Sequence, residues 1–380
     1  MSEYVRYVKQ LAKPVAPRLS QLDIELTERC NNNCIHCCIN LPVNDRQAKQ
    51  LEMTSEQVKE YLQQAADLGC LTVRFTGGEP LLRTDFEEVY LYARRLGLKV
   101  QLFTNARLIT RRVADLFSGV PPLELIEVTV YGMHKESYEA VTRKMGSFVQ
   151  FWSGVNRLLD QGIPFLVKSC ILPENKSDMG EFESWAGTIP WMQDRPGYTV
   201  FFDLRSRCNN TEKNQQIKLL RPSPQEGLAL LEKCNADYYT ELRKFASKFM
   251  GPQADKLFQC GASAGSLCID AYGCLQPCMN LRSPELTIQG EKPFNALVHF
   301  SHLSKLRASN PDYLERCGRC FLHGLCEQCP AKSWSETGSL DTPIEYVCQV
   351  AHLQARRLGL LVENEFAWEV LDWRERIARA

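Results

Sequence analysis

The sequence has no excess of charge of either sign. Its 45 lysine and arginine residues balance 45 aspartate and glutamate residues, so the formal net charge at pH 7 is zero. Proteins that hold nucleic acids through phosphate contacts need a basic surface. The composition therefore argues against a nucleic-acid partner, although a local basic patch is compatible with it.

The sequence also lacks long apolar runs. It contains no stretch of roughly 18 consecutive apolar residues, about the least that a membrane-spanning helix needs. Residues 1–20 are basic, contain Pro14 and Pro17, and have no continuous apolar segment, so they do not resemble a secretory signal. Internal repeats and low-complexity tracts are missing too. We therefore expect a cytoplasmic protein with no membrane partner.

Cysteine, by contrast, is abundant, with 17 residues in a chain of 380. In a reducing cytoplasm thiols stay free of disulfides, so thiols clustered in the sequence are expected to bind metal. Hydrophobic residues make up 44% of the chain, which allows a substantial core in one large domain plus a smaller one.

The first cysteine group is Cys30, Cys34 and Cys37, followed directly by Cys38. A cubane iron–sulfur cluster has four irons, so three thiolates at these spacings would leave one iron open to a substrate or cofactor. The group follows an apolar strand candidate at 22–26, which predicts a loop at a strand end. A zinc site or a set of buried free cysteines is the alternative interpretation.

The periodicity of residues 21–204 predicts alternating strands and helices. Thr54 and Gln57 match a capping box at the start of the first long helix. The strand candidates are 22–26, 71–75, 98–103, 125–131, 164–172 and 198–204, and the helix candidates are 54–68, 84–96, 107–117, 135–144, 147–161 and 178–188. Six such alternations predict a parallel α/β sheet, whereas eight would close a barrel.

A second motif, Gly77-Gly78-Glu79-Pro80, follows the strand candidate at 71–75. Its two glycines permit close approach of the backbone to another group, and a plain tight turn is the alternative. Together, the cysteine group and this motif resemble the radical S-adenosylmethionine (SAM) superfamily.

This resemblance implies a [4Fe-4S] cluster on the three cysteines, with an open iron that chelates the amino and carboxyl groups of SAM. It implies that the Gly-Gly-Glu-Pro segment binds the SAM amino group, with the glutamate as an acceptor. The implied fold is a partial (β/α)6 TIM-like barrel, whose wide side admits large substrates such as peptides.

Five further positions are candidates for the SAM site. His36 stands where the family usually has an aromatic residue near the adenine, and an imidazole can still stack there. Thr104 and Asn105 end the third strand candidate, where contact with SAM or substrate competes with helix capping. Tyr131 and Arg143 lie in stretches that resemble the family, and there an arginine can pair with the SAM carboxylate through a bidentate guanidinium.

Charged residues near the fifth and sixth strand candidates are also of interest. Lys168 is a second candidate cation for the cofactor site because it interrupts an otherwise apolar strand. Asp203 and Arg205 follow the sixth strand and are candidates for substrate contact. Solvation at a loop edge is the alternative for this pair.

The second cysteine group has nine members between positions 260 and 348. A loop-rich segment of this kind builds little core of its own, so metal is expected to hold it together. Cys317 and Cys320 form one pair on a tight turn, and Cys326 and Cys329 form another. This pairing also suits a structural zinc ion.

The wider pattern resembles the SPASM extension of radical SAM enzymes, which holds two auxiliary [4Fe-4S] clusters. The last short gap has two residues here, where the family usually has three. Cys274 competes with Cys268 for one ligand position. The resemblance implies one cluster on Cys260, Cys268, Cys278 and Cys329, and another on Cys317, Cys320, Cys326 and Cys348.

The remaining cysteines fit neither group. Cys70, Cys170, Cys208 and Cys234 are interpreted as buried structural thiols. Cys38 is interpreted as a packing residue or as a second possible register beside Cys37.

These patterns divide the chain into five segments. We expect an N-terminal arm at 1–20, the partial barrel at 21–222 with a polar linker at 205–222, and a bridging segment at 223–255 with one long helix over 224–250. The SPASM domain is expected at 256–350 and a C-terminal helical segment at 351–380.

The resemblance implies that an external donor supplies one electron to cleave SAM, and that the resulting 5′-deoxyadenosyl radical abstracts hydrogen from the substrate. Our first hypothesis is an oxidative modification of a ribosomally made peptide, such as a thioether or a carbon–carbon crosslink. Because residues 1–20 are too few for a peptide-binding domain, binding of a leader peptide would need a separate leader-binding protein or another surface of this chain.

Other functions are weighed against this one. Met279 and Asn280 follow Cys278, where sulfatase-maturing relatives have an aspartate, and this difference argues against formylglycine formation. A radical SAM dehydrogenase of a small molecule is the first alternative. A non-catalytic iron–sulfur or zinc protein is the second.

Overall fold

The fold is described by a computed structural model for residues 18–37, 39, 41–204 and 211–379. Its sheet contains the six strands predicted from the sequence, each paired in parallel with its neighbour in this set. They are β1 (Gln21–Thr27), β4 (Thr72–Gly77), β5 (Lys99–Thr104), β6 (Leu123–Val130), β7 (Leu166–Cys170) and β8 (Gly197–Thr199). β8 is shorter than predicted, because the chain after Thr199 leaves the sheet edge.

Helices cover the outer face of these strands. They are α3 (Ser55–Asp67), α4 (Phe86–Arg95), α5 (Arg111–Gly119), α6 (Lys135–Thr142), α7 (Ser147–Asp160) and α8 (Met179–Ala186). Alternate strand residues such as Leu22 and Ile24 are buried in the core against the helices, while Asp23 and Glu25 lie on the inner face. The alternation gives the inner face its polar character, as expected for the α/β fold predicted from the sequence.

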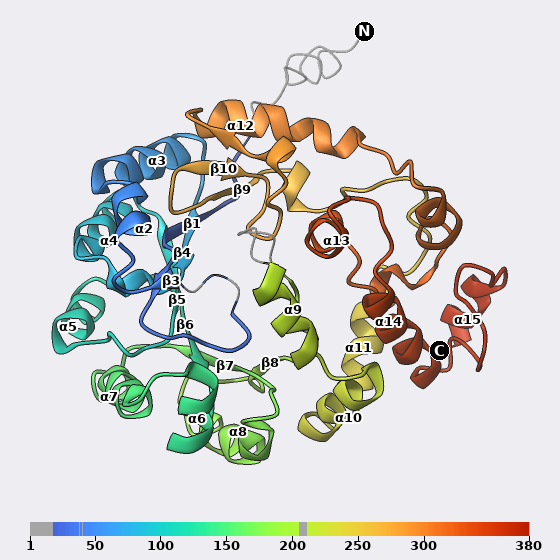
Figure 1. Ribbon diagram of the computed structural model, residues 1–380, viewed down its shortest axis with the longest axis horizontal. Helices are drawn as coiled ribbons and strands as arrows, with labels where there is room; N and C mark the ends of the chain where they lie inside the picture. The colour runs from blue at the N-terminus through green and yellow to red at the C-terminus, as the bar shows by residue number, and fades with distance from the viewer. Residues whose placement is uncertain (1–17, 38, 40, 205–210, 380) are drawn as a thin grey trace, which may run out of the picture.

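The C-terminal region extends the same sheet, which the sequence did not predict. β9 (Ser266–Ile269) pairs in parallel with β1, and β10 (Cys274–Gln276) and β11 (Ile288–Gln289) continue antiparallel. The strand order is therefore β11-β10-β9-β1-β4-β5-β6-β7-β8. Figure 1 shows the sheet as an arc, open on the side of α9 (Thr211–Leu220) and α13 (Pro330–Thr337).

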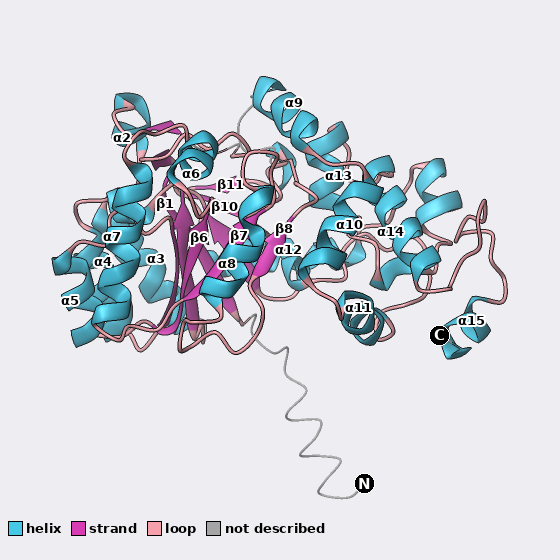
Figure 2. Ribbon diagram, turned by 90° about the horizontal axis from the view of Figure 1, so that it is seen from below, coloured by secondary structure: helices cyan, strands magenta, loops and turns pink. Residues whose placement is uncertain are grey.

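The remaining C-terminal helices lie to one side of the sheet, as Figure 2 shows. A second hydrophobic core forms there around Phe321, Leu322 and Ala355. These helices are α10 (Pro224–Cys234), α11 (Tyr238–Ala246), α14 (Glu345–Arg357) and α15 (Trp373–Arg379), while α12 (Pro293–Phe300) packs on the β9–β10 hairpin. Among the described residues, no helix has both the length and the apolar character that a membrane crossing requires.

Three segments have more secondary structure, or a different division of it, than expected. The predicted linker at 205–222 contains helix α9 within its described part. The single helix at 224–250 is two helices, because Asn235 adopts an extended backbone and its side chain accepts from the Asp237 N–H at 3.0 Å. The loop after β1 carries the helix α2 (Arg46–Leu51) and the short paired strands β2 (Arg29–Cys30) and β3 (Leu41–Pro42).

Candidate functional site

A cavity of about 360 Å³ lies at the carboxyl ends of the parallel strands, the end at which α/β barrels carry their chemistry. We call it the strand-end cavity. It brings together residues from the loop after β1 and from the ends of β4 to β8. The predicted site residues that line it are Cys30, Cys34, His36, Cys37, Gly77, Gly78, Thr104, Asn105, Tyr131, Lys168 and Asp203.

The two motif glycines pack against the loop that carries the cysteines. A Cβ on Gly77 would lie 2.2 Å from the Thr27 carbonyl oxygen, and one on Gly78 would lie 2.2 Å from that of Arg29. The Gly78 N–H also donates to the Thr27 carbonyl at 2.7 Å. Their close approach therefore joins the end of β4 to the cysteine loop and leaves no room for a side chain there.

Glu79 is buried and is not among the residues that line the strand-end cavity, so its predicted role as an acceptor from SAM stays a prediction. Its carboxylate accepts hydrogen bonds from the Thr104 hydroxyl at 2.8 Å, the Asn105 N–H at 2.8 Å and the Leu81 N–H at 3.2 Å. Burial raises its pKa to about 7. Glu79 therefore ties the ends of β4 and β5 together, and Pro80 behind it does not line the cavity.

The cysteine loop is held by amides and by one arginine that the sequence analysis missed. Asn105 donates to the Asn31 side chain at 2.7 Å and lies 3.8 Å from the Cys30 sulfur. The Arg107 guanidinium donates to the Asn31 carbonyl and to the Asn32 side chain. The sequence signal for Arg107 is only its position two residues after the polar end of the third strand.

The thiols of the first group are buried, which disfavours their ionised form. Burial raises the pKa of Cys30 to about 12 and that of Cys34 well above its usual value. The Tyr131 hydroxyl hydrogen-bonds the Cys34 sulfur. Because metal binding requires thiolates, a bound cation would supply the charge that this environment lacks.

His36 packs among aromatic rings in the same cavity. Its ring centroid lies 5.8 Å from that of Tyr131 and 5.7 Å from that of Phe202. Burial lowers its pKa to about 4, so the imidazole is neutral and suited to stacking. Its Nε2 lies 3.7 Å from the sulfur of Cys170, so Cys170 is a buried thiol that also lines the site.

The charged candidates behave differently from one another. Arg143 is exposed at the end of α6, with a left-handed φ of 50°, and does not line the strand-end cavity. Lys168 does line it, pairs with Glu127 and lies 4.5 Å above the Phe103 ring. Arg205, Cys38 and Cys208 lie outside the described residues.

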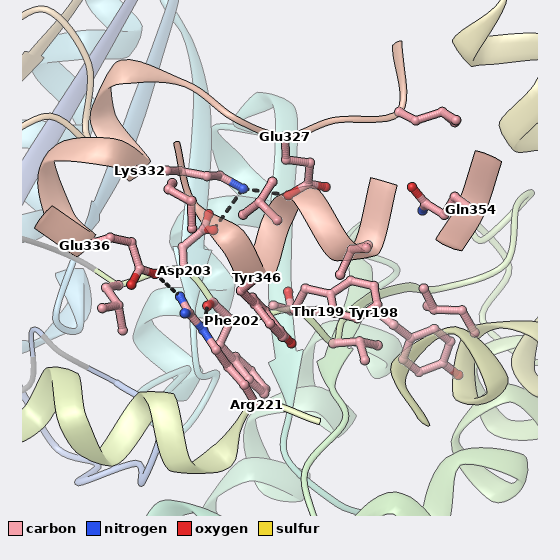
Figure 3. Close-up of a pocket in the computed structure, with 18 of the residues that line it drawn as sticks. Tyr198, Thr199, Phe202, Asp203, Arg221, Glu327, Lys332, Glu336, Tyr346 and Gln354 are labelled. Carbon is pink, nitrogen blue, oxygen red and sulfur yellow. Dashed lines mark hydrogen bonds and ion pairs between the residues drawn. The ribbon is translucent and has the colours of Figure 1, made fainter. Parts of the chain in front are cut away.

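Asp203 borders a second cavity of about 300 Å³, shown in Figure 3. This cavity shares Asp203 and Phe202 with the strand-end cavity and lies between β8 and the helices α13 and α14. The Lys332 amine sits 2.8 Å from Asp203 and 2.5 Å from Glu327. Asp203 is therefore an ion-paired residue at the junction of the two cavities.

Four distal cysteines surround a third cavity, together with Arg316, His352 and Trp368. The four cysteines are those predicted for one auxiliary cluster, namely Cys317, Cys320, Cys326 and Cys348. Burial raises the pKa of Cys317 and Cys326 to about 12. Four cysteines around one cavity are the ligand set that a [4Fe-4S] cluster requires.

The other predicted set is partly assembled. Cys260 and Cys329 lie close enough to Cys278 to raise its pKa, after the larger effect of burial. On the β9–β10 hairpin Cys268 faces Gln276, two residues before Cys278, whereas Cys274 lies farther along, beside Asp270. This register favours Cys268 over Cys274 as the fourth ligand. Among the described residues, no three His, Cys, Asp or Glu side chains converge tightly enough to hold a single metal ion.

The barrel can now be compared with known proteins. Residues 24–186 match the family model of the radical SAM superfamily. The chain contains a radical SAM domain. Such a domain implies SAM and a [4Fe-4S] cluster, and the buried thiols, close-packed glycines and aromatic rings of the strand-end cavity fit both.

Relatives in sequence extend beyond the radical SAM domain. The chain is 24% identical over 345 residues to an AdoMet-dependent heme synthase of Methanosarcina barkeri, covering 86% of this chain and 95% of the relative. It is 30% identical over 182 residues to a probable GTP 3′,8-cyclase of Halobacterium salinarum, covering 46% of each.

Solved structures show the same fold. SuiB of Streptococcus suis bound to SAM has a TM-score of 0.63 and 17% identity, covering 91% of this chain and 80% of SuiB. The enzyme anSMEcpe with bound AdoMet has a TM-score of 0.60 and 15% identity, covering 95% of this chain and 98% of anSMEcpe. The shared fold therefore includes the region that follows the barrel.

Proposed function

We propose that this radical SAM enzyme oxidises a ribosomally made peptide and uses two auxiliary [4Fe-4S] clusters in a SPASM domain. The observation that carries the proposal is the strand-end cavity, where the three motif cysteines meet the motif glycines and a set of aromatic rings. We place the enzyme in the cytoplasm, where thiols stay reduced.

The chain's own residues prepare this cavity. Cys30, Cys34 and Cys37 would hold a [4Fe-4S] cluster, which would supply the single electron for reductive cleavage of SAM and thereby the radical chemistry that removes hydrogen from the substrate. His36 and Tyr131 offer stacking surfaces for the adenine, and the backbone of Gly77 and Gly78, which lines the cavity, would bind the amine. Arg107 keeps the cysteine loop in place through Asn31 and Asn32.

A cluster bound by the distal cysteines would accept the electron that the substrate loses on oxidation. Cys329 lies three residues before Lys332, whose N–H approaches the Cys329 sulfur at 3.5 Å. Lys332 in turn pairs with Asp203 at the wall of the strand-end cavity. A cluster on Cys329 would thus lie close to substrate, and an external donor and acceptor would complete the electron balance.

The peptide substrate is supported by fold neighbours, since SuiB has been solved bound to its precursor peptide SuiA. The second cavity adds room beside the first, with both charged and aromatic walls. A separate leader-binding protein belongs to this proposal. Synthesis of heme is the second candidate, because a heme synthase aligns with 86% of the chain.

Anaerobic reconstitution tests the enzyme class. We expect about twelve irons per chain, corresponding to three clusters, and release of 5′-deoxyadenosine from SAM with a reductant. The variant Cys34→Ser should lose about four of these irons and all SAM cleavage. A chain that binds zinc and leaves SAM intact would refute the proposal and favour a non-catalytic protein.

A second assay separates the substrates. The loaded enzyme is incubated with SAM and reductant, either with candidate precursor peptides or with iron porphyrins. Loss of hydrogen from a peptide, detected by mass spectrometry, supports the first candidate. Appearance of the heme absorption spectrum supports the second. Oxidation of a sugar or an alcohol alone would establish a small-molecule dehydrogenase instead.

A further inference from the structure

Arg282 is buried beside the β9–β10 hairpin, and two of its donors have no acceptor in the part of the chain that the structure describes. Its side chain is 5% exposed, and its Nη2 donates to Glu25 at 2.8 Å. The same Nη2 lies 4.0 Å from the sulfur of Cys268. Its Nε and Nη1 have no hydrogen-bond partner among the described residues, although both atoms are shielded from solvent.

Such an arrangement is costly unless another acceptor is present. Buried polar atoms are nearly always hydrogen-bonded, and an unpaired charged donor loses its full solvation. One carboxylate partner for a five-donor guanidinium is therefore incomplete. Because Nη2 of the same guanidinium lies beside the Cys268 sulfur, an acceptor bound at Cys268 would be a neighbour of these spare donors.

Arg316 repeats the pattern at the other distal site. Its Nη2 lies 3.9 Å from the sulfur of Cys348, and its buried Nε has no partner among the described residues. Its Nη1 pairs with Glu345 at 2.6 Å and with Asp312 at 3.3 Å. The guanidinium also lies 5.0 Å above the Trp368 ring, which fixes its orientation toward the four-cysteine cavity.

We propose that Arg282 and Arg316 donate hydrogen bonds to sulfur at the two auxiliary clusters and raise the reduction potential of each. This inference rests on the proposed function, which supplies the clusters. A donor and a positive charge beside sulfur stabilise the reduced state, which carries one more negative charge. The spare N–H groups of each arginine then find acceptors in cluster sulfur.

The two arginines differ in a way that predicts unequal effects. Arg282 is more deeply buried and has one carboxylate partner, whereas Arg316 is 20% exposed and has two. Solvent and the second carboxylate weaken the field of Arg316. Loss of Arg282 should therefore shift a potential further than loss of Arg316.

The test is a redox titration of the full chain, followed by electron paramagnetic resonance. Combined replacement of the first three cysteines by alanine leaves only the auxiliary clusters to observe. In this background Arg282→Gln should lower the reduction equilibrium constant of one cluster at least tenfold, or about 59 mV. The other cluster should stay unchanged. Arg316→Gln should lower the potential of the other cluster by a smaller amount and leave the first unchanged, so each variant is a control for the other.

Two further variants separate hydrogen bonding from charge balance. The double variant Arg282→Gln/Glu25→Gln removes both charges of the ion pair at once. If Arg282 only neutralised Glu25, this double variant would return to the starting potential, which would overturn the inference. Arg282→Lys keeps the charge and one donor, so a potential between those of the starting protein and Arg282→Gln supports it.

Other outcomes are also decisive. Unchanged potentials in loaded Arg282→Gln and Arg316→Gln overturn the inference but leave the proposed function intact. The same result would follow if the spare donors bind a substrate carboxylate, because substrate is absent from the titration. If the background chain binds no iron at all, the auxiliary clusters of the proposed function fail as well.

Discussion

The close packing of Gly77 and Gly78 leads to a quantitative prediction. A Cβ at Gly78 would meet the Arg29 carbonyl oxygen at 2.2 Å, and one at Gly77 would meet that of Thr27 at the same distance. Both contacts involve backbone, so the cysteine loop or the end of β4 must move. Gly77 also has a φ of +123°, which side chains rarely adopt, whereas Gly97 has a φ of +81° with open space around it.

These three glycines separate steric clash from backbone strain. Gly97→Ala should cost about 1 kcal/mol from strain alone. Gly78→Ala should cost about 3 kcal/mol from the clash and from the lost hydrogen bond of its N–H to Thr27. Gly77→Ala combines both effects and should cost about 4 kcal/mol or more.

Urea unfolding of each alanine variant, with iron content measured after anaerobic reconstitution, checks the prediction. The Gly77 and Gly78 variants should also retain fewer irons at the first site, because their shift moves the loop that carries Cys30. Gly97→Ala should load normally. If Gly78→Ala unfolds at the urea concentration of Gly97→Ala and loads fully, close packing of the two segments is not what the motif provides.

Three further predictions concern single residues. Arg143→Ala should change the affinity for SAM, measured by equilibrium dialysis, by less than about twofold, because the side chain is exposed. A larger loss of affinity would show that Arg143 does contact the cofactor. Arg107→Ala should lower the iron content of the first site, since its guanidinium holds Asn31, and normal loading would refute this role. Burial alone would raise the pKa of Asp178, but hydrogen bonds from the Ser137 hydroxyl and from backbone N–H groups lower it overall. The carboxylate of Asp178 therefore stabilises the folded state above pH 3.8, and this stabilisation is lost as acid protonates the group. Asp178→Asn should therefore cost about 1–3 kcal/mol at pH 7, with the difference shrinking toward pH 3, and a pH-independent difference would contradict the reasoning.

The fold was predictable where local signals were strong. Apolar strand segments separated by amphipathic helices gave six parallel strands, and the capping box of Thr54 and Gln57 is present as predicted. The gathering of the cysteines, His36 and Tyr131 in one cavity follows from their places at strand ends. The carboxyl ends of parallel strands meet at one edge of the sheet, so sequence position alone was sufficient.

Features that depend on distant partners were not predictable. The direction of Glu79 is decided by donors at Thr104 and Asn105, a whole strand away. Arg107 follows the end of β5 and Arg143 follows the end of α6, and only packing determines which one reaches the cysteine loop. Residues 205–222 are polar enough for a linker, yet Ile217 is buried in a hydrophobic cluster with Leu172 and Phe202. This burial stabilises the helix α9 within the segment.

The pairing of β1 with β9 has a consequence for how the chain is made. Ser20 and Gly265, which hydrogen-bond beside this pairing, are 245 residues apart. At ribosomal speeds the first strand waits roughly 10–50 s for its neighbour. During that time it presents an unpaired strand edge, a known hazard for aggregation. Expression of the chain cut before residue 266 should accordingly yield insoluble material, because β1 then has no β9 to cover its edge.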